Sequence, residues 1–341
     1  MELAKRRRSI ERVRRRGWVA IVILVAGVVA LATTAFRPGT HEASPMSTHI
    51  KLPGPAFNIT TGEGFVWVLI RSAQGCLQVG HCSVVRIDPK TNEVVGKPIR
   101  LADAWSFAVG GGSVWVTQFN GRLARIDPWT GRVRQVSARP IYFGSVAAYG
   151  DGFLWTGNDD ERNKLGSVTK VNPHTNRVVG RPVRVYSPQS IAYGDGAVWD
   201  ADHAGWLIKI DPRTLKVVAR TRLGFGPHGV VTTPDAVYVA DAHGGRLLEV
   251  DPATAKIRRI ATLAVPAIYP VVGAGSLWSG SALIWGGPPQ ENDDRLIRID
   301  PPTLRITETV HLGGNIPSVA YGFGSVWAAL STKNEVVRIE P

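Results

Sequence analysis

The 341-residue chain has few charged residues, 20% of the total, and only 2 cysteines, 2 methionines and 7 tyrosines. Together with 44% hydrophobic residues, the low charge excludes a disordered polyampholyte and a membrane protein of many spans. No Ser-His-Asp order, phosphate-binding loop or cluster of transition-metal ligands stands out, so no common motif assigns an activity. The chain does contain 37 Gly and 23 Pro, spread along its length. This distribution favours many short strands joined by tight turns.

Positive charge is concentrated in residues 1–16, which hold eight Lys or Arg. The formal net charge of +13 is therefore weak evidence for a nucleic-acid partner, and we expect none. Residues 17–36 follow without a charge, and a helix of that length spans about 30 Å, the thickness of the bilayer core. Because no comparable basic cluster follows them, the positive-inside rule keeps the N-terminus cytoplasmic and exports the rest.

A cleaved signal peptide is the alternative, since Ala30-Leu31-Ala32 has the small-x-small form of a cleavage site. The length of the apolar segment and Trp18 at the interface favour a retained anchor. Residues 37–46 then form a polar, Pro-containing linker. We therefore predict a basic cytoplasmic segment over 1–16, a single-pass membrane anchor over 17–36 and an extracytoplasmic domain over 47–341, which is secreted if the segment is cleaved.

A repeat fills residues 47–341. An aromatic residue, usually in a Val-Trp pair, recurs seven times at intervals of 39 to 49 residues, and an acidic or amide residue followed by Pro comes after each one. The aromatic residues are Trp67, Trp115, Trp155, Trp199, Tyr238, Trp278 and Trp327. The pairs are Asp88-Pro89, Asp127-Pro128, Asn172-Pro173, Asp211-Pro212, Asp251-Pro252, Asp300-Pro301 and Glu340-Pro341.

Each copy has the pattern of four short strands, and seven copies predict an all-β, seven-bladed β-propeller with four-stranded antiparallel blades. The seventh copy ends after three strands. Residues 48–53 resemble the outer-strand endings of other copies, so we expect them to complete the last blade. This closure would remove exposed sheet edges.

The Asp-Pro-x-Thr units predict type I turns, in which Pro fixes φ and Asp accepts backbone N–H bonds. The residue after Thr should be left-handed, which suits Asn92, Gly131 and Asn176 and fits Leu215, Ala255 and Leu304 poorly. A basic residue stands two positions before the turn residue in six copies, at Arg86, Arg125, Lys170, Lys209, Arg298 and Arg338, with Glu249 the exception. We expect these spread charges to be cross-strand partners or solvated, rather than one patch for an anionic polymer.

Three copies carry insertions between the aromatic residue and the turn, and long loops on a rigid scaffold are candidates for function. The first contains both cysteines, Cys76 and Cys82, which we expect to form a local disulfide; a metal pair with His81 is the alternative. The insertion in the third copy is acidic and is expected to be a solvated loop, with a Ca²⁺ site as the alternative. The insertion in the sixth copy contains Trp285, an aromatic residue outside the repeat that suits ligand recognition.

The turns between blades should surround one mouth of the central channel. They contribute Phe57, Trp105, Tyr142, Phe143, Gln189, His228, Tyr269 and Asn315. Such a rim of aromatic and few polar groups predicts a pocket for a small molecule or peptide. Polar residues also recur three positions after the aromatic residue, at Gln118, Asn158, Asp202, Asp241 and Ser281. We expect them to cap the loops by bonding backbone amides, with ligand contact as the alternative, and we predict that Asp202 contacts the ligand.

The Gly-Asp-Gly-x-Val-Trp and Arg-Ile-Asp-Pro-x-Thr units resemble those of YncE/YVTN and NHL-like propellers and of streptogramin (virginiamycin B) lyases. The lyases are seven-bladed enzymes that open a cyclic ester by elimination, with Mg²⁺ and a catalytic His. Pro227-His228-Gly229 is similar to their Pro-His-Gly unit, and Asp241 stands where they have Glu. The resemblance implies His228 and Asp241 as catalytic residues and Asp241 and Asp202 as metal ligands.

The sequence therefore supports two functions. The leading prediction is a membrane-anchored extracytoplasmic propeller, non-enzymatic and without a cofactor, that binds a small molecule, peptide or protein through its loop-rich face. The alternative is a Mg²⁺-dependent lyase that opens a cyclic ester or depsipeptide.

Overall fold

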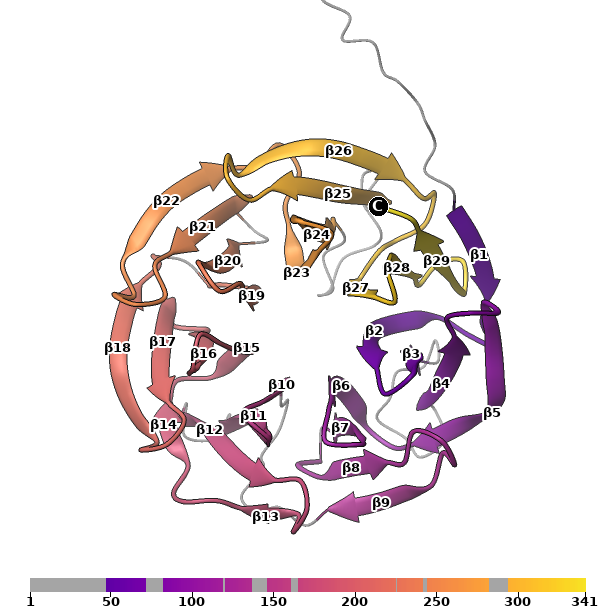
Figure 1. The fold of residues 1–341 in the computed structure, drawn as a ribbon, viewed down its shortest axis with the longest axis horizontal. Helices are drawn as coiled ribbons and strands as arrows, with labels where there is room; N and C mark the ends of the chain where they lie inside the picture. The colour runs from indigo at the N-terminus through magenta and orange to yellow at the C-terminus, as the bar shows by residue number, and fades with distance from the viewer. Residues whose placement is uncertain are drawn as a thin grey trace, which may run out of the picture. The chain divides into compact units, whose positions relative to one another are not determined.

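The computed structural model describes residues 47–71, 82–118, 120–136, 146–160, 165–224, 226–241, 244–281 and 294–341. These residues form seven antiparallel sheets arranged around a centre (Figure 1). The predicted all-β, seven-bladed propeller is confirmed. The predicted anchor and linker, residues 17–36 and 37–46, lie outside the described residues. Within the described part of the chain, no helix is long and apolar enough to cross a membrane.

Each blade runs outward from a strand at the centre. Blade 1 comprises β2 (Ala56–Gly62), β3 (Phe65–Arg71), β4 (Cys82–Asp88) and β5 (Glu93–Leu101), and blade 2 comprises β6 (Ala104–Val109), β7 (Val114–Gln118), β8 (Leu123–Ile126) and β9 (Val133–Val136). Blade 3 comprises β10 (Val146–Gly150), β11 (Phe153–Asp160) and β12 (Leu165–Asn172), with an outer strand divided into β13 (Arg177–Val178) and β14 (Val183–Val185). Blade 4 comprises β15 (Pro188–Gly194), β16 (Ala197–Asp202), β17 (Trp206–Asp211) and β18 (Lys216–Arg222).

Blade 5 comprises β19 (Gly229–Thr232), β20 (Val237–Asp241), β21 (Arg246–Val250) and β22 (Ile257–Thr262). Blade 6 comprises β23 (Ile268–Gly273), β24 (Ser276–Gly280), β25 (Arg295–Asp300) and β26 (Arg305–His311). Blade 7 comprises β27 (Ser318–Gly322), β28 (Ser325–Leu330) and β29 (Glu335–Ile339), and its outermost strand is β1 (Ser47–Lys51).

The pairing of β1 with β29 closes the ring, as the sequence predicts. The two strands are antiparallel and pair from Ser47 with Ile339 to Lys51 with Glu335. The buried Glu335 carboxylate accepts from Lys51 and lies 2.9 Å from His49 Nδ1. The hydrogen bonds with these two partners lower the pKa of Glu335, and the bond with His49 contributes most. The closure therefore combines a backbone ladder with a charged contact at one end.

The repeated Trp residues fill the spaces between blades. All six are buried, and five of them donate the indole N–H to the carbonyl of the Gly five residues earlier, as Trp67 does to Gly62 at 3.0 Å. Trp67 packs in one apolar cluster with Val114 and Val116 of blade 2. In these five the indole N–H is bonded within its own turn, so the ring is buried against the neighbouring blade without an unsatisfied donor, whereas the buried Trp199 Nε1 has no hydrogen-bond partner in the described ranges.

Most of the basic residues before the turns connect one blade to the next, so the prediction that they are cross-strand partners or solvated charges is wrong for these. It holds for Arg298, whose Nη1 lies 3.8 Å from Glu308 on the paired strand. The other five donate to backbone carbonyls of the following blade's Asp-Pro or Asn-Pro turn at 2.6 to 2.9 Å. The bonds run from Arg86 to Pro128, from Arg125 to Pro173, from Lys170 to Pro212, from Lys209 to Pro252 and from Arg338 to Pro89. We call these contacts the blade bridges.

The cation of a blade bridge also lies over an aromatic ring of its own blade. In four of the five bridges this ring is the repeated Trp, at 5.1 to 5.4 Å from the ring centroid, and in the fifth Arg86 lies 5.1 Å from Phe65. Each cation therefore combines a cation–π contact with a hydrogen bond to a neighbouring sheet.

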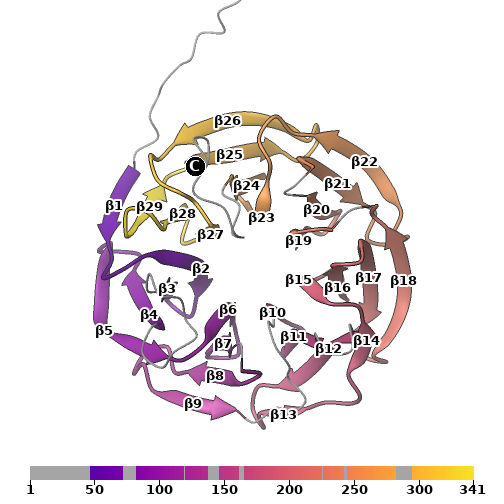
Figure 2. The ribbon, with the colours of Figure 1, turned by 180° about the vertical axis from the view of Figure 1, so that it is seen from behind.

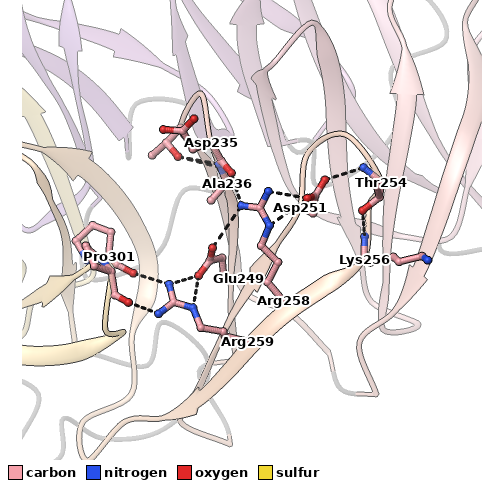
Figure 3. Close-up of polar contacts among 11 residues, drawn as sticks. Asp235, Ala236, Glu249, Asp251, Thr254, Lys256, Arg258, Arg259 and Pro301 are labelled. Atoms are coloured by element: carbon pink, nitrogen blue, oxygen red, sulfur yellow. Dashed lines mark hydrogen bonds and ion pairs between the residues drawn. The ribbon is translucent and has the colours of Figure 1, made fainter.

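Blade 5 lacks this cation because Glu249 occupies the position, and β22 supplies a replacement (Figure 3). Arg259 forms an ion pair with Glu249 and donates to the carbonyl of Pro301 in blade 6 at 2.9 Å. Its neighbour Arg258 bonds the turn residue Asp251 at 2.6 Å. The pKa of Asp251 is lowered to about 2, most strongly by the hydrogen bond from the Thr254 amide and next by the hydrogen bond from Arg258. A bridge to the next blade is thus retained although its donor comes from another strand.

The left-handed turn residues include three that the sequence did not favour. Leu215, Ala255 and Leu304 have φ of 56°, 56° and 55°, close to the 60° of Asn92. Ala255 and Leu304 are only 3% and 2% exposed, and they pack in clusters shared with the preceding blade. Burial in the seam between blades offsets the cost of the left-handed conformation, so the expectation of a poor fit was wrong at these positions.

Neighbouring blades also approach closely where the innermost strands end. A Cβ on Gly150 would lie 2.1 Å from Cγ of Tyr193 in blade 4. A Cβ on Gly152, in the turn that follows, would meet nothing within 4 Å, although its φ is +73°. The first glycine is required by space and the second by backbone conformation.

We therefore expect Gly150→Ala to lower the free energy of unfolding by about 3 kcal/mol, because the added methyl group displaces a packed ring. Gly152→Ala should cost about 1 kcal/mol, the cost of a left-handed alanine. Chemical denaturation of both variants measures the difference. Equal losses of unfolding free energy in the two variants would show that the Tyr193 ring moves aside without cost, and would contradict this prediction.

Candidate functional site

The seven innermost strands surround the centre of the ring (Figure 2). Residues of all seven blades line a cavity of about 250 Å³ there. Its walls are polar and apolar in about equal parts, and five side chains supply neutral polar groups: Asn58, Ser106, Ser190, Tyr269 and Ser318. No charged side chain is among its described lining residues. Some of the serines also link neighbouring blades, since Ser318 Oγ accepts the Ile59 amide at 3.3 Å. The cavity can therefore hold an apolar group and offer it weak neutral hydrogen bonds.

The aromatic rim is produced by β-bulges at the start of the innermost strands. In β2, Ala56 pairs with Ile70 and Asn58 with Leu69, which leaves Phe57 as the extra residue. Trp105 and Gln189 occupy the same position in β6 and β15. Such bulges redirect a side chain away from the regular alternation. Phe57 and Trp105 line the cavity, as does Tyr269, which lies in an irregular stretch of β23 with φ of 49°.

Other predicted rim residues lie elsewhere. Gln189 does not line the cavity and donates to Ser187 Oγ at 3.3 Å. Asn315 also lies outside it, where its Oδ1 accepts from Ser331 at 3.0 Å, and Pro317 lines the cavity in blade 7 instead. Pro317 lies ten residues before Trp327, as Phe57 does before Trp67, so the regular spacing identifies Pro317 and the predicted Asn315 lies two residues too early.

Several predicted residues fall outside the described part of the chain: Tyr142, Phe143, Trp285 and Cys76. Cys82 is disulfide-bonded. Its pairing with Cys76 stays a prediction.

Arg71, at the end of β3, was not among the residues singled out from the sequence. Its guanidinium carbon lies 3.7 Å from the centroid of the Phe57 ring and 5.4 Å from that of Trp105. The two rings are themselves in contact, with centroids 5.6 Å apart. Burial lowers the pKa of Arg71. A sequence signal existed, because among the Val-Trp strands only that of blade 1 has a basic residue at this position.

The polar residues three positions after the repeated aromatic act as loop caps. All five are buried, and three accept backbone amides of the following turn: Asp202 from Trp206, Asp241 from Gly244 and Ser281 from Arg295, at 2.9 to 3.2 Å. The capping role is confirmed for these three.

The candidate catalytic pair lies at the start of blade 5. The His228 amide donates to the Ala240 carbonyl at 2.9 Å, which places His228 opposite Asp241 on the paired strand. The Asp241 carboxylate accepts from Arg246 Nε at 2.9 Å and lies 2.8 Å from Nη2, while its other oxygen accepts the Gly244 amide. Asp241 is therefore engaged in a structural ion pair.

These residues do not fit a Mg²⁺ site. A cation at Asp241 would compete with the Arg246 guanidinium for the same oxygen. In the described ranges, no group of three or more His, Cys, Asp or Glu is placed to hold a metal ion. The catalytic and metal-binding roles of His228, Asp241 and Asp202 stay predictions from the resemblance.

Asp200 is a buried acid that sequence analysis did not single out. It is fully buried in the centre of blade 4, and within the described structure neither carboxylate oxygen has a hydrogen-bond partner. Desolvation, followed by the charge of Asp202, raises the pKa of Asp200 well above its usual range. Its signal was visible, because Asp200 directly follows Trp199, where the other blades have uncharged residues.

Comparison with known proteins supports the fold and assigns no family. No protein-family model matches the chain, and no curated protein matches it. The WD40 beta propeller domain of Doa1 is similar in structure, with a TM-score of 0.64 at 10% identity, over 86% of this chain and 96% of that chain. A likeness at this identity shows the propeller fold alone, because one fold hosts many unrelated functions.

The protonation of Asp200 makes stability depend on pH. At pH values above about 3.9, the pKa of an unfolded Asp, the folded state keeps the Asp200 proton while the unfolded state releases it. This release lowers the free energy of the unfolded state and so destabilises the fold. As pH rises from about 4, the wild type should lose stability relative to Asp200→Asn by about 1.4 kcal/mol per pH unit, until the folded pKa is reached. Urea denaturation across this range tests it, with the exposed Asp195→Asn as control. Parallel curves for wild type and Asp200→Asn would contradict it.

Proposed function

We propose that the chain is a ligand-binding module whose site is the mouth of the central channel. The observation that carries the proposal is the cluster of Phe57, Trp105 and Arg71, where two bulged aromatic rings contact each other at the edge of the cavity and carry a guanidinium on one face. Aromatic groups with a few polar neighbours are typical of small-molecule sites. A cavity of about 250 Å³ suits a small molecule or a single peptide side chain.

The cellular setting of this proposal comes from the sequence. The uncharged residues 17–36 after the basic segment 1–16 support a membrane anchor, with the propeller on the extracytoplasmic side. Cleavage after the apolar segment would instead release a secreted propeller with the same site.

We propose a non-enzymatic role because the candidate catalytic acid is already in use. Asp241 forms an ion pair with Arg246 and caps its own turn. The Mg²⁺-dependent lyase remains the second proposal, on the Pro227-His228-Gly229 unit alone.

Replacement of Trp105 tests the binding site. The full-length chain is screened by thermal shift against free amino acids, dipeptides and small organic acids. Binding of any compound that stabilises the wild type should weaken at least about tenfold in Trp105→Ala, since a lost aromatic contact costs about 1.4 kcal/mol. Trp129→Ala is the matched control, because Trp129 is 67% exposed in an outer turn. Unchanged binding in Trp105→Ala would place the site elsewhere.

The lyase is tested by incubation with Mg²⁺ and a type B streptogramin, followed by chromatography. The non-enzymatic proposal predicts that the antibiotic stays cyclic. Ring opening that is lost in His228→Ala would overturn this proposal and establish the lyase.

A further inference from the structure

We infer that the channel-mouth ligand carries a carboxylate, and that Arg71 binds it while the apolar body of the ligand enters the cavity. This inference rests on the proposed function, because it names the ligand class for the same site.

The position of Arg71 makes it the charged group of this site. The described lining of the cavity contains no charged side chain. Arg71 lies on the ring of Phe57, at 3.7 Å, and Phe57 and Trp105 both line the cavity. A group bound between the rings and the neutral serines would therefore meet one cation, at the rim.

Arg71 lacks a counter-ion within the described structure. No described carboxylate lies within ion-pair distance of it, whereas Arg246, Arg258 and Arg259 each have one. Its Nε is buried and has no hydrogen-bond partner in the ranges that the structure describes. The residues that follow in sequence, 72–81, contain no Asp or Glu.

An aromatic face compensates a guanidinium only in part. It attracts the charge, but it does not accept the in-plane N–H bonds that the group loses when it leaves water. A carboxylate accepts two parallel N–H bonds from one guanidinium, which matches the single cation here. A phosphate dianion would call for more than one cation, so a monocarboxylate fits the site better.

The cavity limits the rest of the ligand. Its walls combine aliphatic, Pro and aromatic side chains with the neutral polar groups of Asn58, Tyr269 and three serines, and its volume is about 250 Å³. The class is therefore a small organic acid with an aliphatic or aromatic body, or an amino-acid residue with a free carboxyl terminus.

Benzoate and its neutral isostere benzamide test the inference on the full-length chain. Titrations by calorimetry or ligand-observed NMR should show that benzoate binds the wild type at least about tenfold more tightly than benzamide, and that Arg71→Met loses this preference. The matched control is Arg222→Met, because Arg222 also lies over an aromatic ring, 5.0 Å from Trp206, on the exposed side of blade 4. Benzoate affinity should be unchanged in that variant and should fall with added salt in the wild type.

The outcomes separate the two proposals. Equal binding of benzoate and benzamide, both lost in Trp105→Ala, would overturn the role of Arg71 and leave the channel-mouth site standing. Benzoate binding that survives both Arg71→Met and Trp105→Ala would overturn the carboxylate inference, and so would a complete lack of benzoate binding. In either case, the compound screen with Trp105→Ala still tests the channel-mouth site independently.

Arg71→Lys provides a second variant if Arg71→Met does not fold. It keeps the charge but loses the planar pair of donors, so it should bind benzoate more weakly than the wild type and still prefer it to benzamide. A Lys variant that binds both probes equally would contradict the inference.

Discussion

Among the described strands, neighbouring blades of this propeller share no backbone ladder, so the ring depends on side chains that cross the seams. The blade bridges meet this need: a cation lies over an aromatic ring of its own blade and donates to a turn carbonyl of the next. A carbonyl at such a turn has lone pairs to spare, and the cation has several N–H groups, so one residue can serve both blades. The same contact joins blade 7 to blade 1 through Arg338 and Pro89, so the seam where the ring closes has the bridge that blades 1 to 4 also make to their following blades. Blade 5 shows how strongly the contact is maintained, since Arg259 reaches across when Glu249 takes the usual place.

The same arrangement sets the limits of sequence analysis. The Trp and Asp-Pro repeats predicted the number of blades and the strand that closes the ring, because both depend on local turn chemistry and on the count of copies. The partners of Arg125 or Lys170 could not be predicted, since they lie on the following blade, more than forty residues away along the chain. Leu304 was judged by its own backbone preference, and its burial in the seam could not be seen from the sequence. Local rules were reliable within a blade and failed between blades.

The site followed the same division. Trp105 and Tyr269 were predicted correctly as part of the cavity lining, because both stand at the start of an innermost strand, where the blade faces the channel. Asn315 was misplaced, because it lies twelve residues before Trp327, whereas Pro317 lies at the ten-residue interval that Trp105 keeps from Trp115. Arg71 was missed because it lies on the second strand of its blade, where side chains were expected to pack in the core or to cap loops. The result is a neutral cavity with one cation at its edge, a division of roles that spacing alone does not reveal.

The pairing of β1 with β29 has a consequence for the order of events during synthesis. Of the propeller strands, β1 is made first and β29 last, so β1 waits without its partner until the whole domain has left the ribosome. Contacts so distant in sequence form slowly, and an unpaired strand is an aggregation hazard while it waits. The exposed polar residues Ser47, Thr48, His49 and Lys51 make this strand a poor template for other chains. Completion of the ring is then a late, single event, which only a full-length chain can undergo.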